Sequence, residues 1–89
     1  MEKPDLYVVA RFLDIMYRNG SMKKTNIQML LGTNYPRFIE YLEWLENHEL
    51  VAETSDPEMG ERIVLTTKGL DSYHRLVDWI KETLEGVKI

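Results

Sequence analysis

The fold of this chain is indicated most clearly by the stretch Gly32–Val51, which reads GTNYPRFIEYLEWLENHELV. Gly32 suits the left-handed position that closes a helix. Either Thr33 or Asn34 can cap the helix that follows, and Pro36 fits its first turn. Apolar side chains then recur every three or four residues, at Phe38, Tyr41, Leu42 and Leu45. This spacing predicts a tight turn followed by an amphipathic helix.

Two more helices are expected before this stretch. Pro4 is a good first-turn residue for the first of them, which we expect to end near Asn19 and Gly20. Its apolar residues have helical spacing, at Leu6, Val9, Leu13 and Met16. Ser21 can cap a second, shorter helix. The apolar face of that helix holds Ile27, Leu30 and Leu31.

A hairpin and a last helix are expected after the third helix, which we predict to end near His48. The extended runs Leu50–Glu53 and Arg62–Leu65 contain β-favouring residues, and the residues between them, TSDPEMGE, are rich in turn formers. Thr66 or Thr67 can cap the last helix. Its apolar residues alternate three and four apart in a heptad-like pattern, at Leu70, Tyr73, Val77, Ile80, Leu84 and Val87.

This order of elements is that of a winged helix-turn-helix, an α+β, mainly helical fold with three helices, a two-stranded wing and a long C-terminal helix. The segments KKTNIQMLLGTNYPRFIEYLEWLENHELV, residues 23–51, and RIVLTTKGLDSY, residues 62–73, resemble the small archaeal winged-helix DNA-binding proteins. The residues that match are Glu40, Tyr41, Leu42, Leu45, Leu65, Thr66, Lys68 and Gly69. The resemblance implies a DNA-binding transcriptional regulator or chromatin protein that dimerises through its last helix.

The length of 89 residues fits one domain. We expect residues 1–66 to form the winged-helix core and residues 67–89 to form a C-terminal helix of the same domain. No apolar run reaches the roughly 20 residues that span a bilayer, and the start MEKPD lacks the order of a signal peptide. We therefore expect a cytoplasmic protein without a membrane partner.

Charge is divided unevenly along the chain. The net charge is -4, but residues 11–37 carry five basic residues and one acidic residue, whereas residues 38–60 carry seven acidic residues and neither lysine nor arginine. A basic segment before the third helix favours a duplex DNA partner. The acidic segment favours an alternative function, a winged-helix module that binds a basic protein partner through its third helix and wing.

The residues expected to contact DNA lie near the start of the third helix, which enters the major groove in this type of fold. Thr33, Asn34 and Arg37 belong to that start. Arg37 can bind a guanine or a phosphate, or it can pair with Glu40. The remaining candidates lie on or before the preceding helix and on the wing: Lys23, Lys24, Asn26, Gln28 and Arg62.

Three glutamates, Glu40, Glu43 and Glu46, form an acidic row along the same third helix. Because Glu43 and Glu46 lie about two turns beyond Arg37, we expect them to point away from DNA. Glu40 lies about one turn beyond Arg37 and can pair with it, accept a hydrogen bond from a cytosine amino group, or repel DNA. The acidic wing tip should contribute little to DNA binding.

The last helix is a candidate dimer interface because its heptad-like side chains can pack on a second copy, although the same helix can simply complete its own core. Those side chains are Leu70, Tyr73, Val77, Ile80 and Leu84. A two-fold dimer would present two basic segments to successive turns of the major groove.

Catalysis and cofactor binding find no support in the sequence. His48 and His74 have no metal-ligand spacing, cysteine is absent, and there is no glycine-rich phosphate loop. Aromatic residues Tyr35, Tyr41 and Trp44 could stack on single-stranded bases, but we expect them in the core or at an interface. We therefore expect a binding protein that is not an enzyme and needs no cofactor or metal.

Overall fold

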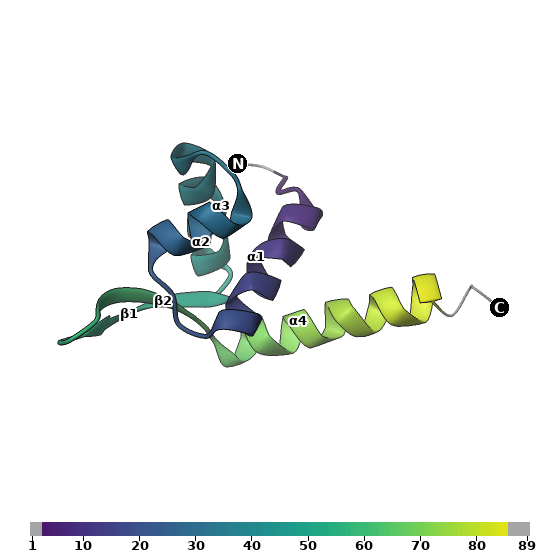
Figure 1. Cartoon of the computed structure of the whole chain (residues 1–89). Coiled ribbons are helices and arrows are strands. Elements are labelled where there is room, and N and C mark those ends of the chain that lie inside the picture. Colours follow the sequence, from purple (N-terminus) through teal and green to yellow (C-terminus); the bar gives the residue numbers. More distant parts are fainter. Residues whose placement is uncertain (1–2, 86–89) are drawn as a thin grey trace.

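The predicted order of helices and strands is confirmed. A computed structural model describes the backbone of residues 3–85 and the side chains of residues 3–83. Its elements, in chain order, are α1 (Leu6–Asn19), α2 (Lys24–Leu31), α3 (Tyr35–Asn47), β1 (Val51–Asp56), β2 (Gly60–Leu65), α4 (Thr67–Ile80) and a π-helical turn, η1 (Lys81–Glu85) (Figure 1). Two residues of the predicted heptad-like pattern fall outside this description: the side chain of Leu84, a predicted interface residue, and the whole of Val87.

Helix ends follow the predicted capping residues in most places. Gly32 adopts the left-handed conformation, with φ 73° and ψ 33°, and closes α2. The side chain of Asn34 caps α3 by accepting a hydrogen bond from the amide of Arg37 at 2.9 Å. Thr66 caps α4 in the same way, accepting from the amide of Gly69 at 2.9 Å. The local chemistry of these caps is sufficient to define both ends of the turn between α2 and α3.

Two predicted helix starts are wrong. Helix α1 begins at Leu6 and not at Pro4, because the carboxylate of Asp5 caps it by accepting a hydrogen bond from the amide of Tyr7. Ser21 does not cap α2, which begins after Lys23 without a side-chain cap. The reason is a long-range contact, since Met22 forms an isolated antiparallel bridge with Ile63 of β2 and keeps this segment extended.

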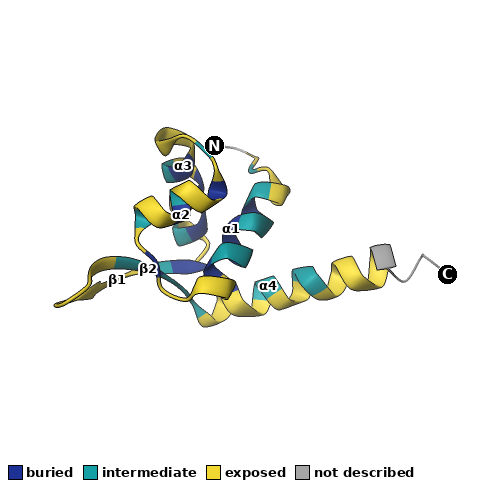
Figure 2. Ribbon diagram, in the orientation of Figure 1, coloured by how far each residue is buried: buried dark blue, intermediate teal, exposed yellow. Residues whose placement is uncertain are grey.

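The core lies between α1, α2, α3 and the base of the hairpin (Figure 2). Its largest fully buried side chains are Phe12, Met16, Ile27, Phe38, Leu45 and Ile63. The rings of Phe12 and Phe38 stack with centroids 5.8 Å apart and join α1 to α3. The strands are longer than predicted, and their register places Val51 opposite Leu65 at the base and Asp56 opposite Gly60 at the tip.

A glycine lets α4 begin directly against β1. A Cβ atom at Gly69 would overlap the carbonyl oxygen of Leu50, which already accepts a hydrogen bond from the amide of Thr66 at 3.1 Å. Gly69 is the fully buried residue of α4. Gly69, one of the residues on which the resemblance to winged-helix proteins rests, is therefore required by packing at the junction of the wing and the last helix.

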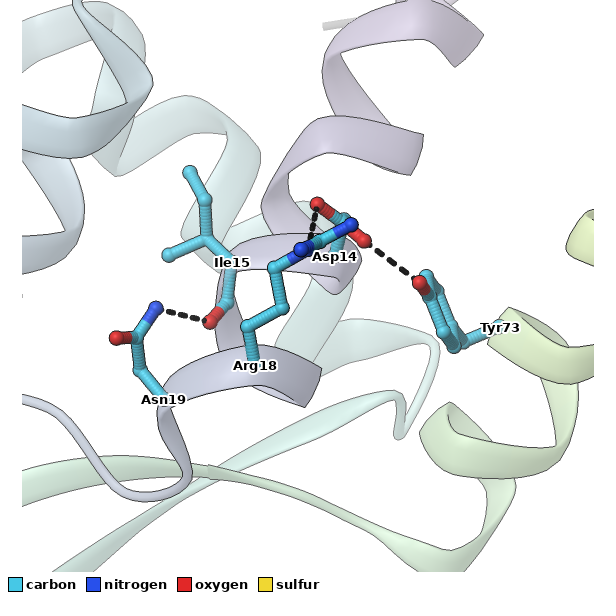
Figure 3. Close-up of polar contacts among 5 residues, drawn as sticks. All are labelled: Asp14, Ile15, Arg18, Asn19 and Tyr73. Carbon is cyan, nitrogen blue, oxygen red and sulfur yellow. Dashed lines mark hydrogen bonds and ion pairs between the residues drawn. The ribbon is translucent and has the colours of Figure 1, made fainter.

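Polar contacts (Figure 3) and an aromatic stack then hold α4 against α1. The hydroxyl of Tyr73 donates to Asp14 at 2.6 Å, and Asp14 also pairs with Arg18 at 2.9 Å. The Tyr73 ring stacks on Tyr17, with centroids 4.6 Å apart. Beyond these contacts α4 runs away from the core, and its outer half carries exposed and half-buried residues (Figures 1 and 2).

Candidate nucleic-acid interface

Arg37 lies in the first turn of α3 with its side chain exposed. Its guanidinium carbon lies 5.5 Å from the centre of the Tyr41 ring, a cation–π arrangement that holds it above α3. The alternative in which Arg37 pairs with Glu40 is not observed, and the described residues contain no ion pair that involves either side chain. The donors of Arg37 are thus free to meet a ligand.

The turn between α2 and α3 is braced from inside the chain. Gln28 is half-buried, and its side-chain amide donates to the carbonyl oxygen of Thr33 at 3.2 Å. This bond gives Gln28 a structural function, and Thr33 is itself half-buried. Lys23 and Asn26, at the start of α2, are exposed.

Lys24 behaves differently from its neighbour Lys23. Its ammonium group forms an ion pair with Glu53 of β1 at 3.1 Å, with 32% of the Lys24 side chain exposed. The hydrogen bond that Lys24 donates to Glu53 raises the pKa of Lys24, and the same bond is the largest cause that lowers the pKa of Glu53. Glu46 joins the pair from α3, and its own pKa is raised, first by burial and then by Glu53.

The cation that the sequence suggested for the wing, Arg62, is engaged within the chain. Arg62 is half-buried, and its guanidinium donates to the carbonyl oxygen of Ser21 at 3.0 Å, which ties β2 to the segment before α2. At the tip, Asp56 accepts from the amides of Glu58 and Met59, and these bonds lower the pKa of its carboxyl. The tip is therefore acidic and organised around a carboxylate.

The acidic row of α3 divides in two. Glu46 turns toward β1, as just described, but Glu40 and Glu43 are exposed on the side of α3 opposite the core. They line a shallow depression together with Trp44 and Asn47. Glu43 thus shares the exposed side of α3 with Glu40, because the helical period of 3.6 places residues 40, 43 and 47 opposite the buried ones. The expectation that Glu43 and Glu46 point away from DNA stays a prediction.

The three aromatic residues of α3 also differ from one another. Tyr41 is buried, as expected, and its hydroxyl accepts a hydrogen bond from the amide of Asp5 at 2.9 Å. Trp44 is half-buried and stacks on His48, with centroids 4.0 Å apart. Tyr35 is 50% exposed and lies outside the core, so of its two expected places only an interface is left, and that stays a prediction.

The predicted dimer residues of α4 lie partly in a groove. Tyr73 is engaged with α1 inside the chain, through Asp14 and Tyr17. Val77 and Ile80 line an apolar groove of about 260 Å³ between α1 and α4, whereas Leu70 is 39% exposed. The remaining lining residues are Tyr7, Ala10, Arg11, Asp14, Tyr73 and Leu76.

One residue of the interface could not be predicted. Glu53 is separated from Lys24 by 29 positions, and the bridge between Met22 and Ile63 brings the start of α2 to the wing where the pair forms. The sequence marks Glu53 as one of seven acidic residues in its segment, and no local pattern distinguishes it from the others.

Within residues 3–85, no helix is long and apolar enough to cross a membrane, and no cluster of acidic or histidine side chains could hold a metal ion.

Comparison with known proteins gives structural likenesses without a sequence family. No family model matches the chain, and no curated protein matches it significantly. The solved structure of F93 from STIV, a winged-helix DNA-binding protein, superposes with a TM-score of 0.79 at 16% identity, over 92% of this chain and 96% of that one. The repressor CouR, bound to a 23-mer DNA duplex, gives a TM-score of 0.78 at 25% identity over 86% of this chain.

The PcaV transcriptional regulator from Streptomyces coelicolor gives a TM-score of 0.76 at 19% identity over 84% of this chain. This chain spans 57% of the PcaV chain and 56% of the CouR chain, so it corresponds to little more than half of each regulator. The protein therefore has a winged helix-turn-helix fold, and its structural neighbours include a winged-helix DNA-binding protein, a transcriptional repressor bound to DNA and a transcriptional regulator.

Proposed function

We propose that this protein binds duplex DNA as a transcriptional regulator or chromatin-associated factor, with the start of α3 in the major groove. The observation that carries the proposal is the state of Arg37, which is exposed and unpaired among the described side chains, at the end of a helix that this fold presents to DNA. Its guanidinium fork suits the two acceptors of guanine or a phosphate. Asn34 and Thr33 lie beside it.

The other predicted contacts separate into two groups. Lys23 and Asn26 are exposed at the start of α2, the helix that crosses the DNA backbone in this fold, and we assign them to phosphates. Gln28 and Arg62 already donate to carbonyl oxygens of the chain. We therefore assign these two residues to positioning the turn and the wing rather than to contacting DNA.

A homodimer forms part of the same proposal. The apolar groove between α1 and α4 and the exposed outer half of α4 leave apolar side chains of this single chain in water. A second copy that packs along α4 would cover them and double the number of cations that face DNA. The alternative function, binding of a basic protein partner through the acidic surface of α3 and the wing, is supported only by the charge of that surface.

A salt series on duplex DNA tests the function. We expect the binding constant of the wild type, measured by fluorescence anisotropy on a mixed-sequence duplex, to fall steeply with salt. Lys23→Ala removes one phosphate contact, so the slope of log K against log salt should become less steep by about 0.9 per chain. Arg37→Ala should weaken binding further. Arg75→Ala is the matched control, since Arg75 pairs with Asp71 on α4, and it should leave the slope unchanged.

The function is rejected if the wild type binds no duplex even at low salt. It is also rejected if Arg75→Ala lowers the slope as much as Lys23→Ala does, because binding would then depend on overall charge and not on this face.

A further inference from the structure

The junction of α2, α3 and β1 contains a network of charges in which one lysine meets two glutamates. Lys24 of α2 pairs with Glu53 of β1 at 3.1 Å, and both side chains remain partly exposed, at 32% and 43%. Glu46, from α3, lies close enough to this pair for Glu53 to raise the pKa of its carboxyl, after burial, which is the larger cause. Glu61 of β2 adds a further negative charge close enough to act on Lys24. Lys24 is therefore paired with Glu53, and Glu46 and Glu61 add negative charge nearby.

A DNA phosphate and the carboxylate of Glu53 offer the Lys24 ammonium the same kind of partner, an anionic oxygen. The two anions compete for the ammonium group, because a carboxylate that already pairs with Lys24 repels an approaching phosphate. Lys23, the preceding residue, is exposed. Adjacent lysines on α2 are thus in two different states, although the sequence presents them as an equivalent pair.

We propose that Glu53 is an internal competitor that holds Lys24 away from DNA phosphates, so that α2 grips the backbone with Lys23 and not with both lysines. The inference rests on the proposed function and adds a feature that limits the affinity of the protein for DNA. Fewer phosphate contacts reduce the affinity for DNA of any sequence, and this leaves a larger share of binding to the base contacts of α3.

The test compares two glutamates of the wing. Glu53→Gln removes the competing charge beside Lys24, and Glu58→Gln removes a charge from the exposed tip, where the side chain pairs with no described cation. Binding to a mixed-sequence duplex at low salt should tighten by about five-fold for Glu53→Gln, the worth of an exposed ion pair. The salt slope should steepen by about 0.9 as one more phosphate is neutralised. Glu58→Gln should leave the slope unchanged.

A double variant tests whether the gain in DNA binding of Glu53→Gln depends on Lys24. In the Lys24→Gln background, Glu53→Gln should lose its gain in affinity and in slope, while circular dichroism should show that all variants keep the helical content of the wild type. If the wild type binds DNA but Glu53→Gln behaves like Glu58→Gln, or keeps its gain without Lys24, the inference is overturned and the function stands. If neither the wild type nor any variant binds duplex DNA, both fail.

Discussion

At the end of α3, Glu49 holds a backbone conformation that usually belongs to glycine. Its φ is 60°, and it is the non-glycine residue with positive φ in the described chain. The amide of Glu49 donates to the carbonyl of Glu46 at 3.0 Å, and the amide of Leu50 donates to that of Leu45 at 2.9 Å. These two bonds, with Leu45 and Leu50 both buried, make a Schellman motif that turns the chain from α3 into β1.

Replacement of Glu49 by glycine should stabilise the fold. The left-handed conformation costs a residue with a Cβ atom about 1–2 kcal/mol. Glycine avoids this cost but loses roughly half of the gain, because it has more conformational freedom to lose when the chain folds. We expect Glu49→Gly to raise the free energy of unfolding in urea by roughly 0.5–1 kcal/mol relative to Glu49→Gln. The glutamine variant removes the same charge from the carboxyl end of the helix, so it isolates the backbone effect. Equal stabilities would mean that Glu49 is not strained.

At the scale of one element, α3 combines two opposite features on its exposed surface. Arg37 is free at its first turn, whereas Glu40 and Glu43 occupy the side opposite the core. If that side enters a groove, the two carboxylates approach phosphates and base edges, and they reduce the affinity for DNA unless they accept a hydrogen bond from a base amino group.

The double variant Glu40→Gln with Glu43→Gln should therefore bind mixed-sequence DNA more tightly than the wild type at low salt. A gain of about two- to ten-fold is expected from the removal of two partly screened charges, and it should disappear at high salt. Glu82→Gln, on the turn after α4, is the control for net charge. An unchanged affinity of the double variant at low salt would show that this side of α3 does not approach DNA, which would contradict the docking proposed for it.

The elements show which parts of the fold and of the site could be predicted from sequence. Gly32, Asn34 and Thr66 act on neighbours within three or four residues, so their effects follow from local chemistry. The start of α2 and the pair of Lys24 with Glu53 depend on β2 and β1, which are distant in the sequence. Residue types therefore identified the candidate DNA contacts, but long-range contacts decide which cations are free.

At the scale of the whole molecule, α4 carries apolar side chains that its own domain does not bury. Tyr73 fixes its inner half to α1, while Leu70 and Trp79 remain 39% and 57% exposed and Ile80 lines the apolar groove. Apolar side chains that continue along a helix beyond its own domain are typical of a contact with another chain. The proposed dimer follows from this excess of apolar surface.

Ile80→Asp should separate such a dimer without unfolding the domain, because Ile80 lies beyond the contacts that hold α4 to α1. We expect sedimentation velocity to show a wild-type dimer that dissociates on dilution, and a variant that stays monomeric with unchanged helical content. Arg75→Asp, at an exposed position about 140° around the helix from Ile80, is the matched control and should remain dimeric. Because each chain of a dimer contributes its own cations, Ile80→Asp should also reduce the salt slope of DNA binding to about half. A wild type that is monomeric at every concentration would instead mean that the groove and α4 serve the single chain, and that DNA affinity depends on one Arg37 and one Lys23.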